Sequence, residues 1–324
     1  MKYLLLFVGL VVLANIYIKF ALRYNIVDRP NHRSSHLMET VRGGGMIFPI
    51  STLGWFIYSG FRFPMLFTGL IFISIVSFWD DILSVSNKLK LIVHFVAILL
   101  LFTELQWSIM PWWYWIPALI SAAWTINVYN FMDGINGITG GYSLSVLIGF
   151  WIVNNYQVAF ITNDLIYFMM IPIIIFSYFN FRTKAKCFAG DVGSISIAYL
   201  IVFLLAKLIL QSGNWLYILF LSIYGVDTLF TIVHRLIKGE DIFVAHRKHL
   251  YQLLVNEFKI SHLKIAALYA IIQLIICLII VEVIDKNNSL LSSLMTGASI
   301  IVILIVAFYL TRSKIYKKVK VVRT

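Results

Sequence analysis

The sequence of residues 112–154 is WWYWIPALISAAWTINVYNFMDGINGITGGYSLSVLIGFWIVN. Two apolar runs, 112–129 and 138–154, enclose a short polar run that begins at Asn127 and ends at Gly137. Each apolar run approaches the length of about 20 residues that a membrane-spanning helix needs. The stretch therefore predicts two membrane helices that meet in a polar connection at one face of a bilayer.

The same hydrophobic pattern extends over the whole chain. Of its 324 residues, 61% are hydrophobic and 12% are charged, and the mean hydropathy is +0.90. A soluble domain carries about 25% charged residues, so we expect an all-α fold, a polytopic membrane helical bundle of about eleven transmembrane helices. The expected spans are roughly 3–22, 45–60, 64–79, 91–108, 112–129, 138–154, 164–180, 193–210, 215–233, 263–284 and 290–311. Whether 45–79 holds two full spans or one helical hairpin is left open.

The distribution of basic residues predicts the orientation. If the loop 23–44 lies in the cytoplasm, most Lys and Arg side chains outside the spans lie there too, and the other side keeps Lys2, Arg62 and Lys286. This asymmetry follows the positive-inside rule and predicts an outside N-terminus and a cytoplasmic C-terminus. It accounts for most of the net charge of +12 without nucleic acid as a partner.

Residues 1–311 are expected to form a single integral-membrane domain. Residues 312–324, which are rich in Lys and Arg, are expected to form a basic cytoplasmic tail. The simplest partner of this tail is the anionic headgroups of membrane lipids. The positive-inside rule explains the same charges without any specific partner.

With this threading, four polar runs lie at span ends on the cytoplasmic face, which favours an active site for a charged, water-soluble substrate. The run within 127–137 is the sharpest of them. Asn127 and Asn130 are three residues apart and share a helix face, and Asp133 and Asn136 continue the spacing. Three amides and one carboxylate, separated by glycines, suit a nucleotide or a metal-bound phosphate. The alternative is a capped helix end with Asx turns.

A second polar run ends the third span with Asp80 and Asp81, and Lys88 and Lys90 follow. Adjacent carboxylates beside a bilayer are costly unless a cation or a task compensates for them. One use is the binding of Mg²⁺ and phosphate, because hard oxygen ligands suit Mg²⁺, and another is a base. The alternative is an interfacial acidic pair that contacts the neighbouring lysines.

Two further runs carry residues that suit phosphates. Asp191, just before the eighth span, either caps that helix or binds a metal at its N-terminus, and Phe188 beside it could stack on a base. In the largest cytoplasmic loop, His246, Arg247 and His249 belong to a His-Arg-Lys-His run whose cationic side chains suit a pyrophosphate. A solvated basic loop is the alternative for this run.

The first loop contains Asp28-Arg-Pro-Asn31 and, further on, Arg42-Gly-Gly-Gly45. Its glycines could cradle a phosphate through backbone N–H groups, although Gly-Lys-Ser/Thr, the signature of a P-loop, is missing. Taken in order from about residue 27 to 252, all these runs resemble the polyprenyl-phosphate N-acetylhexosamine-1-phosphate transferases of glycosyltransferase family 4. That family includes the bacterial undecaprenyl-phosphate GlcNAc-1-phosphate transferases and the phospho-MurNAc-pentapeptide translocase.

The resemblance implies one reaction. A UDP-N-acetyl sugar gives its sugar 1-phosphate to undecaprenyl phosphate in the bacterial cytoplasmic (inner) membrane, and UMP leaves. Mg²⁺ is the implied cofactor, with Mn²⁺ as an alternative, and a homodimer is left open.

The resemblance also implies roles for individual residues. The implied metal ligands are Asp191 and Asn130. The implied catalytic residues are Asp80 and Asp81, one of them the base for the lipid phosphate, with Asp133, His246 and His249. The implied substrate-binding residues are Asn136 and Phe188 for uracil, together with Lys90, Arg247 and Asn127.

Two departures narrow the implied substrate. Many bacterial members carry Asp-Gly-Ile-Asp-Gly, where this chain has Asp133-Gly-Ile-Asn136-Gly; an amide can pair with uracil but cannot act as a base. The His-Arg-Lys-His run also differs from the His-His-His run of the peptidoglycan branch, which makes MurNAc-pentapeptide the less favoured substrate. We therefore expect GlcNAc or a related 6-deoxy sugar, in the first membrane step of O-antigen, capsule, teichoic acid or a similar glycan. The alternative is a flippase for a lipid-linked sugar, which would need polar residues deep within its spans.

Overall fold

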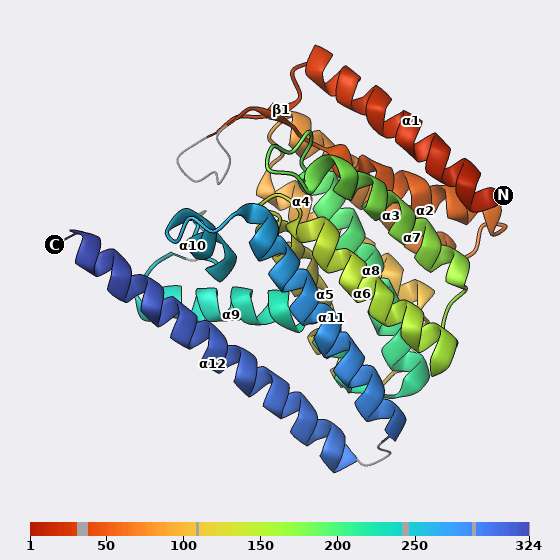
Figure 1. Ribbon diagram of the computed structural model, residues 1–324. Helices are drawn as coiled ribbons and strands as arrows, with labels where there is room; N and C mark the ends of the chain where they lie inside the picture. Colours follow the sequence, from red (N-terminus) through yellow and green to blue (C-terminus); the bar gives the residue numbers. More distant parts are fainter. Residues whose placement is uncertain (31–37, 108–109, 242–245, 287–289, 324) are drawn as a thin grey trace.

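The computed structural model describes residues 1–30, 38–107, 110–241, 246–286 and 290–323 (Figure 1). These residues are mostly helical, as predicted. The α-helices are α1 (Lys2–Arg23), α2 (Ile47–Tyr58), α3 (Pro64–Ile82), α4 (Asn87–Glu104), α5 (Trp115–Met132), α6 (Ile138–Tyr156), α7 (Asn163–Asn180), α8 (Gly190–Ser212), α9 (Ser222–Ile237), α10 (Leu250–Asn256), α11 (His262–Lys286) and α12 (Leu290–Arg323). Short 3-10 helices are η1 (Gly44–Met46), η3 (Trp112–Tyr114) and η4 (Trp215–Leu221), and two short strands are β1 (Val27–Asp28) and β2 (Thr40–Val41).

Each predicted span coincides with a helix, but not every helix can cross a bilayer. Within the described ranges, seven segments are long and apolar enough: α1, α3, α7, α8, η4 with α9, α11 and α12. Helix α2 has 12 residues, which is about 18 Å against a hydrocarbon core of about 30 Å. Residues 45–79 therefore do not hold two full spans, and α4, α5 and α6 are not among the seven.

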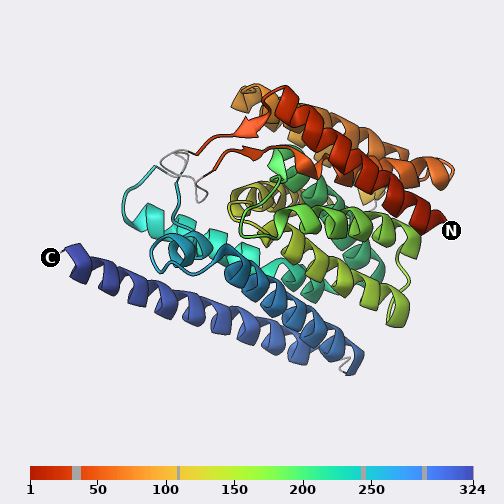
Figure 2. The ribbon, with the colours of Figure 1, turned by 45° about the horizontal axis from the view of Figure 1, so that its top comes forward.

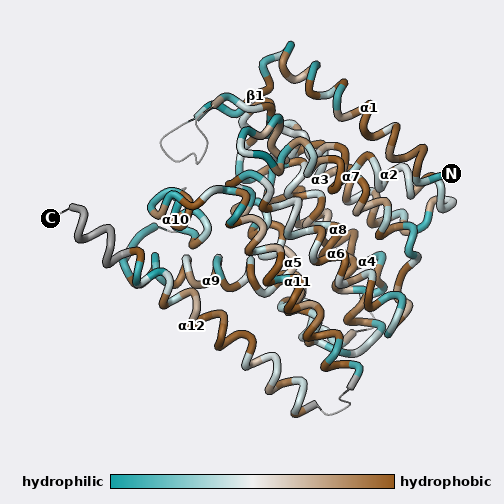
Figure 3. Tube along the Cα trace, in the orientation of Figure 1, coloured by the Kyte–Doolittle hydropathy of each residue, from teal (hydrophilic) through white to brown (hydrophobic). Residues whose placement is uncertain are grey.

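Helix α8 lies at the centre of the bundle, where it is almost wholly buried and packs against α2, α3 and α5. Helix α6 pairs with α11, and α1 packs on the outside against α7 (Figures 1 and 2). The long helix α12 runs along another side and contacts α9 and α10. Hydrophobic residues dominate the middle of the helices, whereas hydrophilic residues concentrate around β1 and α10 (Figure 3). The protein is a multi-pass α-helical membrane protein.

Different helix ends meet at the two ends of the bundle, which we call the motif end and the opposite end. At the motif end, the C-terminal ends of α3 and α5 meet the N-terminal ends of α6 and α8, beside β1 and α10. At the opposite end lie the C-terminal ends of α6, α8 and α11.

The residues of the expected basic tail belong to α12, which continues to Arg323. Arg312, predicted to belong to that exposed tail, is instead buried, and its Nη1 donates a hydrogen bond to Thr231 Oγ1 of α9 at 3.3 Å. The Arg312 guanidinium also lies over the ring of Phe230. Arg312 thus fastens α12 to α9, and the prediction that it faces lipid headgroups is wrong.

The first loop closes over the start of α8. Its strands β1 and β2 form a hairpin, and Val41 forms a parallel bridge with Cys187. The Gly44 and Gly45 amides donate to the Phe188 and Ala189 carbonyls at 2.8 and 3.0 Å.

The predicted phosphate cradle is therefore wrong for Gly44 and Gly45, since backbone carbonyls already occupy their amides. A Cβ on Gly193 would lie 2.7 Å from the Gly45 Cα, so these glycines allow two backbones to touch. Residues 31–37, part of the loop that carried the resemblance, lie outside the described residues.

Candidate active site

The structure brings the three predicted carboxylates of α3 and α8 together with the amide of α5. Asn130 Nδ2 donates to Asp191 Oδ1 at 3.0 Å and to Ser194 Oγ at 3.3 Å. Asp80 and Asp81 close α3, and Asp191 opens α8, so the helix ends themselves create the cluster. The sequence predicted that the polar runs share one face, and the structure brings these four residues, from three of the runs, together.

Asp81 is fully buried and holds the N-terminus of α8. Its Oδ1 accepts from the Asp191 amide at 2.8 Å, and its Oδ2 accepts from the Val192 amide at 3.1 Å. These are two of the donors that a helix N-terminus leaves without a partner inside the helix. Arg42 Nε adds an ion pair with Asp81 Oδ1 at 2.7 Å. Both oxygens of Asp81 are therefore engaged by the protein.

Gly190 makes this arrangement sterically feasible. Its φ is +72°, in the left-handed region that favours glycine. A Cβ there would lie 2.7 Å from the Gly43 amide nitrogen and would also strike the Asp81 carboxylate. The Gly-Asp pair in the sequence thus reflects a close approach of three chain segments.

Asp80 has a more open position than Asp81. Its Oδ1 accepts from the Val85 amide at 2.8 Å, and its Oδ2 pairs with Lys90 Nζ at 3.0 Å. The carboxyl groups of Asp80 and Asp191 are close enough to interact. Because two like charges repel, a shared proton or a cation would stabilise the pair.

The donor set fits a hard divalent cation. Asp80 and Asp191 supply carboxylates, and the Asn130 amide lies against Asp191. Mg²⁺ takes oxygen ligands and is usually held by one or two carboxylates plus substrate phosphates and water. No group of three or more His, Cys, Asp or Glu that could hold a metal ion occurs in the described part of the chain.

Asp133 lies in the turn between α5 and α6. Its Oδ1 accepts from Thr139 Oγ1 at 2.6 Å. The pKa of Asp133 is raised to about 6, mainly by burial; the hydrogen bond from Thr139 lowers it and the nearby Asp191 carboxylate raises it. Asp133 can therefore change protonation near neutral pH, a property often found at active sites.

Asn136 ties two loops together. Its Nδ2 donates to the Arg182 and Thr183 carbonyls at 2.7 and 3.2 Å, and the side chain is buried. Nearby, Asn180 Oδ1 accepts from the Gly137 amide at 2.6 Å. Both donor hydrogens of Asn136 are thus used by the protein, and its contact with uracil stays a prediction.

Asn127 and Phe188 flank the cluster. Asn127 Nδ2 donates to the Ala123 carbonyl of its own helix at 2.7 Å, as polar side chains within helices often do. Phe188 is half-buried and follows the Cys187 bridge. Their substrate-binding roles also stay predictions.

The His-Arg-Lys-His run precedes α10 and is only partly exposed. The His246 and His249 rings stack with centroids 5.1 Å apart, His249 is buried, and Arg247 is exposed. Burial lowers the pKa of His246 to about 4, and the cationic neighbours add to this effect. His246 is therefore neutral at pH 7, so Arg247 is the exposed fixed cation of the run.

Asp227 is a functional candidate that the sequence reasoning missed. It is fully buried in α9, and its Oδ1 accepts from the Leu250 amide at 2.8 Å and lies 3.5 Å from His249 Nδ1. Its Oδ2 accepts from the Tyr269 hydroxyl at 2.8 Å. A lone carboxylate within the apolar segment 215–233 was the available signal, because such residues are costly in a membrane.

Tyr251 connects this region to the cluster. Its hydroxyl donates to the Phe131 carbonyl at the end of α5 at 3.0 Å. Lys248 Nζ pairs with Glu240 at 2.5 Å, and Glu240 also pairs with Arg235. The basic run is thus held against the α5–α6 turn by buried and surface contacts together.

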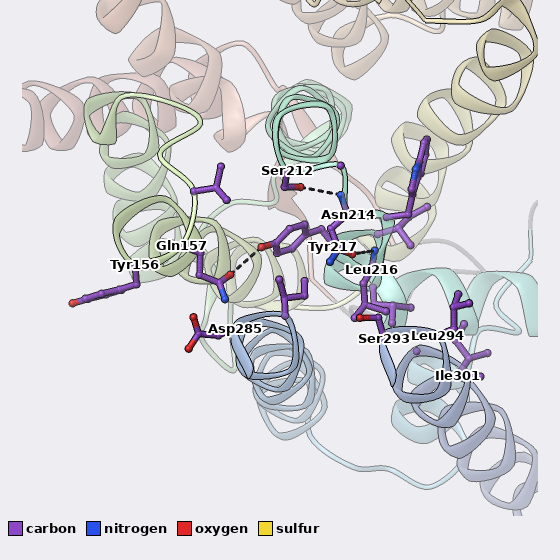
Figure 4. A pocket seen from close by; sticks show the side chains of 18 residues that line it. Tyr156, Gln157, Ser212, Asn214, Leu216, Tyr217, Asp285, Ser293, Leu294 and Ile301 are labelled. Carbon is purple, nitrogen blue, oxygen red and sulfur yellow. Dashed lines mark hydrogen bonds between the residues drawn. The ribbon is translucent and has the colours of Figure 1, made fainter. Parts of the chain in front are cut away.

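A cavity of about 930 Å³ lies at the opposite end, between η4 and the ends of α6, α8, α11 and α12 (Figure 4). Tyr217 crosses it and donates to Gln157 Oε1 at 2.9 Å. None of the predicted site residues lines this cavity. Its walls are mostly apolar, so its size does not mark the site of a charged substrate.

Comparison with known proteins gives one family match and several distant relatives. Residues 63–209 match glycosyl transferase family 4. The "Probable undecaprenyl-phosphate N-acetylglucosaminyl 1-phosphate transferase" of Bacillus subtilis (strain 168) is 25% identical over 266 residues, which cover 75% of this chain and 73% of that protein. The undecaprenyl-phosphate alpha-N-acetylglucosaminyl 1-phosphate transferase of Yersinia pestis is 26% identical over 271 residues, 74% of this chain and 72% of its own length.

A relative from the other branch is similarly distant. The phospho-N-acetylmuramoyl-pentapeptide-transferase of Thermotoga maritima is 24% identical over 257 residues, 70% of this chain and 82% of that protein. Identity therefore does not separate the two kinds of relative. The resemblance that the ordered motifs predicted is confirmed at the level of the family.

Proposed function

Because residues 63–209 carry a glycosyl transferase family 4 domain, we propose that this membrane protein transfers an N-acetylhexosamine 1-phosphate from a UDP-sugar to undecaprenyl phosphate and releases UMP. The relatives named for undecaprenyl phosphate support the lipid acceptor. The observation that carries the proposal is the hydrogen bond from Asn130 to Asp191 at the meeting ends of α3 and α8, where Asp80 also lies. GlcNAc or a related 6-deoxy sugar is the proposed donor sugar, in the first membrane step of a cell-envelope glycan.

The proposed cofactor is Mg²⁺, with Mn²⁺ as the alternative, held by Asp80, Asp191 and the amide of Asn130. When bound, such a cation offsets the charge of the pyrophosphate during phosphoryl transfer. The protein's own contribution is positioning. Arg42 Nη2 lies 3.3 Å from Asp191 Oδ1 and orients that carboxylate toward Asn130.

In the proposed reaction, a phosphate oxygen of undecaprenyl phosphate attacks the β-phosphorus of the UDP-sugar. A bond forms between that oxygen and the β-phosphorus, and the bond to the bridging oxygen breaks, so that UMP leaves. Of the two adjacent carboxylates, Asp80 is the better candidate to accept a proton from the lipid phosphate. Asp81 is the poorer candidate because its side chain is fully buried, whereas the side chain of Asp80 is partly exposed.

The remaining predicted residues have proposed binding roles around this centre. Arg247 would contact a phosphate as an exposed cation, and neutral His246 would contribute an N–H donor. His249, held by Asp227, would be the fixed member of the run.

Several roles rest on the family resemblance alone. Phe188 and Asn136 are proposed to contact uracil, and Asn127, Lys90 and Asp133 to complete the binding site. The N-terminus is proposed to lie outside a bacterial inner membrane and the C-terminus in the cytoplasm. A homodimer remains a separate proposal.

The test is release of UMP by the purified protein in detergent with undecaprenyl phosphate, Mg²⁺ and a panel of UDP-N-acetyl sugars. We expect UMP with one sugar, dependence on the lipid phosphate, and loss of activity on addition of EDTA. The failure of every sugar to yield UMP would contradict the proposal. Translocation of a preformed lipid-linked sugar across reconstituted vesicles, without UMP release, would instead support a flippase.

A further inference from the structure

Two cations lie together at the end opposite the motif cluster. Arg62 precedes α3, and Lys207 lies near the end of α8. Both line a cavity of about 350 Å³, together with Phe63, the α6–α7 connection at 159–162, and Gln211. By the positive-inside pattern this end should carry few cations, so two of them in one cavity require a reason.

Neither cation forms an ion pair with a carboxylate of the described residues. Lys207 is half-buried, and its Nζ lies over the Phe63 ring, 5.2 Å from the centroid. Glu104 is the nearby acid, but its Oε2 accepts from the Met65 and Leu66 amides at 2.7 and 3.3 Å and caps α3. A cation within a membrane segment is costly unless an anion or water compensates for it.

The surroundings point to an anion that belongs to the membrane. Lys207 lies within a segment apolar enough to span the bilayer. Ile57 near the end of α2 and Phe61 in the α2–α3 connection are also exposed, with 65% and 62% of their surfaces accessible. A ligand here would place a negative group between the two cations and an apolar part beside those side chains.

We propose that Arg62 and Lys207 bind the phosphate of an anionic phospholipid headgroup at the end opposite the motif cluster. Arg62 presents a planar donor set suited to a phosphate, and Lys207 supplies a second charge from the side of the bundle. The headgroup would link the start of α3 to the end of α8 and to the α6–α7 connection. This site is independent of the sugar-phosphate reaction.

The experiment is native mass spectrometry of the full-length protein, delipidated in detergent and titrated with phosphatidylglycerol or phosphatidylcholine of the same acyl chains. We expect wild type to bind phosphatidylglycerol about 30-fold more tightly, since two basic residues near a membrane contribute about 1 kcal/mol each. Arg62→Gln with Lys207→Gln should lose most of this preference. Arg62→Lys with Lys207→Arg should keep it, because both charges remain.

The matched control is Lys19→Gln with Arg23→Gln, which removes two exposed cations from α1 outside the cavity and should leave the preference intact. The basic end of α12 is unchanged in every variant and cancels from the comparison. An unchanged preference in the Gln double variant would overturn the proposal. Displacement of phosphatidylglycerol by an equal concentration of inorganic phosphate would overturn it too, by assigning the cavity to free phosphate.

Discussion

The two ends of this bundle differ in their charged groups and in their cavities. At the motif end, charged groups lie within a few ångströms of each other, and Asp81 accepts from two backbone amides and pairs with Arg42. At the opposite end, a cavity of about 930 Å³ has mostly apolar walls, and Asp285 on its lining is exposed. The difference shows that the density of mutually compensated charge, and not the volume of a cavity, locates the candidate chemistry.

The two ends of the bundle differ in charge and in cavity size because their helices end in different surroundings. At the motif end, Gly190 and Gly193 let backbones approach so closely that carboxylates replace water as partners of the helix terminus. At the opposite end, α12 approaches the bundle at Gly297, where a Cβ would lie 2.8 Å from a Leu216 methyl group. Gly297 and Leu216 both line the cavity (Figure 4).

The largest expected effect is on catalysis, from Asp191→Asn. The substitution keeps the shape of the side chain but removes a charge next to Asp80. We expect kcat/KM for UMP release to fall at least about 10²–10³-fold, as for the loss of a preorganised electrostatic group. Thermal unfolding in detergent should change little.

Asp285→Asn is the matched control at the opposite end. It removes one carboxylate of the same kind from the lining of the larger cavity. We expect kcat/KM within twofold of wild type, roughly the experimental spread. Equal losses in both variants would remove the functional distinction between the two ends.

The second prediction is that the two adjacent carboxylates have different roles, one in stability and the other in catalysis. Asp81→Asn should lower the stability by about 3 kcal/mol, because it breaks a buried ion pair with Arg42 and disturbs the N-terminus of α8. Asp80→Asn should leave the thermal midpoint near wild type and reduce kcat. Thermal unfolding and UMP release, measured on both variants, test this division. A stable, inactive Asp81→Asn would reverse the assignment of the base.

Hydropathy predicted the helices well because each expected span is a long apolar run with polar ends. It failed for α2, since the twelve residues of that helix are as apolar as their neighbours and only the turns around them reveal its length. The cluster could be predicted because its members occur in short ordered runs. The capping role of Asp81 and the contribution of Arg42 could not, because they depend on a contact between segments about 40 and 110 residues apart.

Asp227 is a second case in which the sequence alone could not predict the contacts of a residue. The sequence offers one carboxylate in an apolar run, which signals importance but names no partner. Only the packing of α9 against α10 and α11 shows that it accepts from Leu250 and Tyr269 and lies near His249.

The smallest expected effect concerns Asn136, where many family members have Asp. In this chain, its Nδ2 donates to the carbonyls of Arg182 and Thr183. Asn136→Asp would replace two donated hydrogen bonds with a carboxylate facing two carbonyl oxygens. We expect a loss of about 1–3 kcal/mol in stability, the usual effect of leaving buried polar groups without partners.

Two measurements test this prediction on Asn136→Asp and Asn136→Ala: the thermal midpoint of unfolding, and KM and kcat for the UDP-sugar. If the amide mainly fastens the 181–186 loop, Asp should lower the thermal midpoint more than Ala does, because Ala removes the donors without adding a charge. If the amide mainly contacts uracil, Ala should raise KM for the UDP-sugar more than it lowers kcat. A variant with an unchanged thermal midpoint and a raised KM would favour the substrate contact, and would mean that the two carbonyls find other donors when the nucleotide binds.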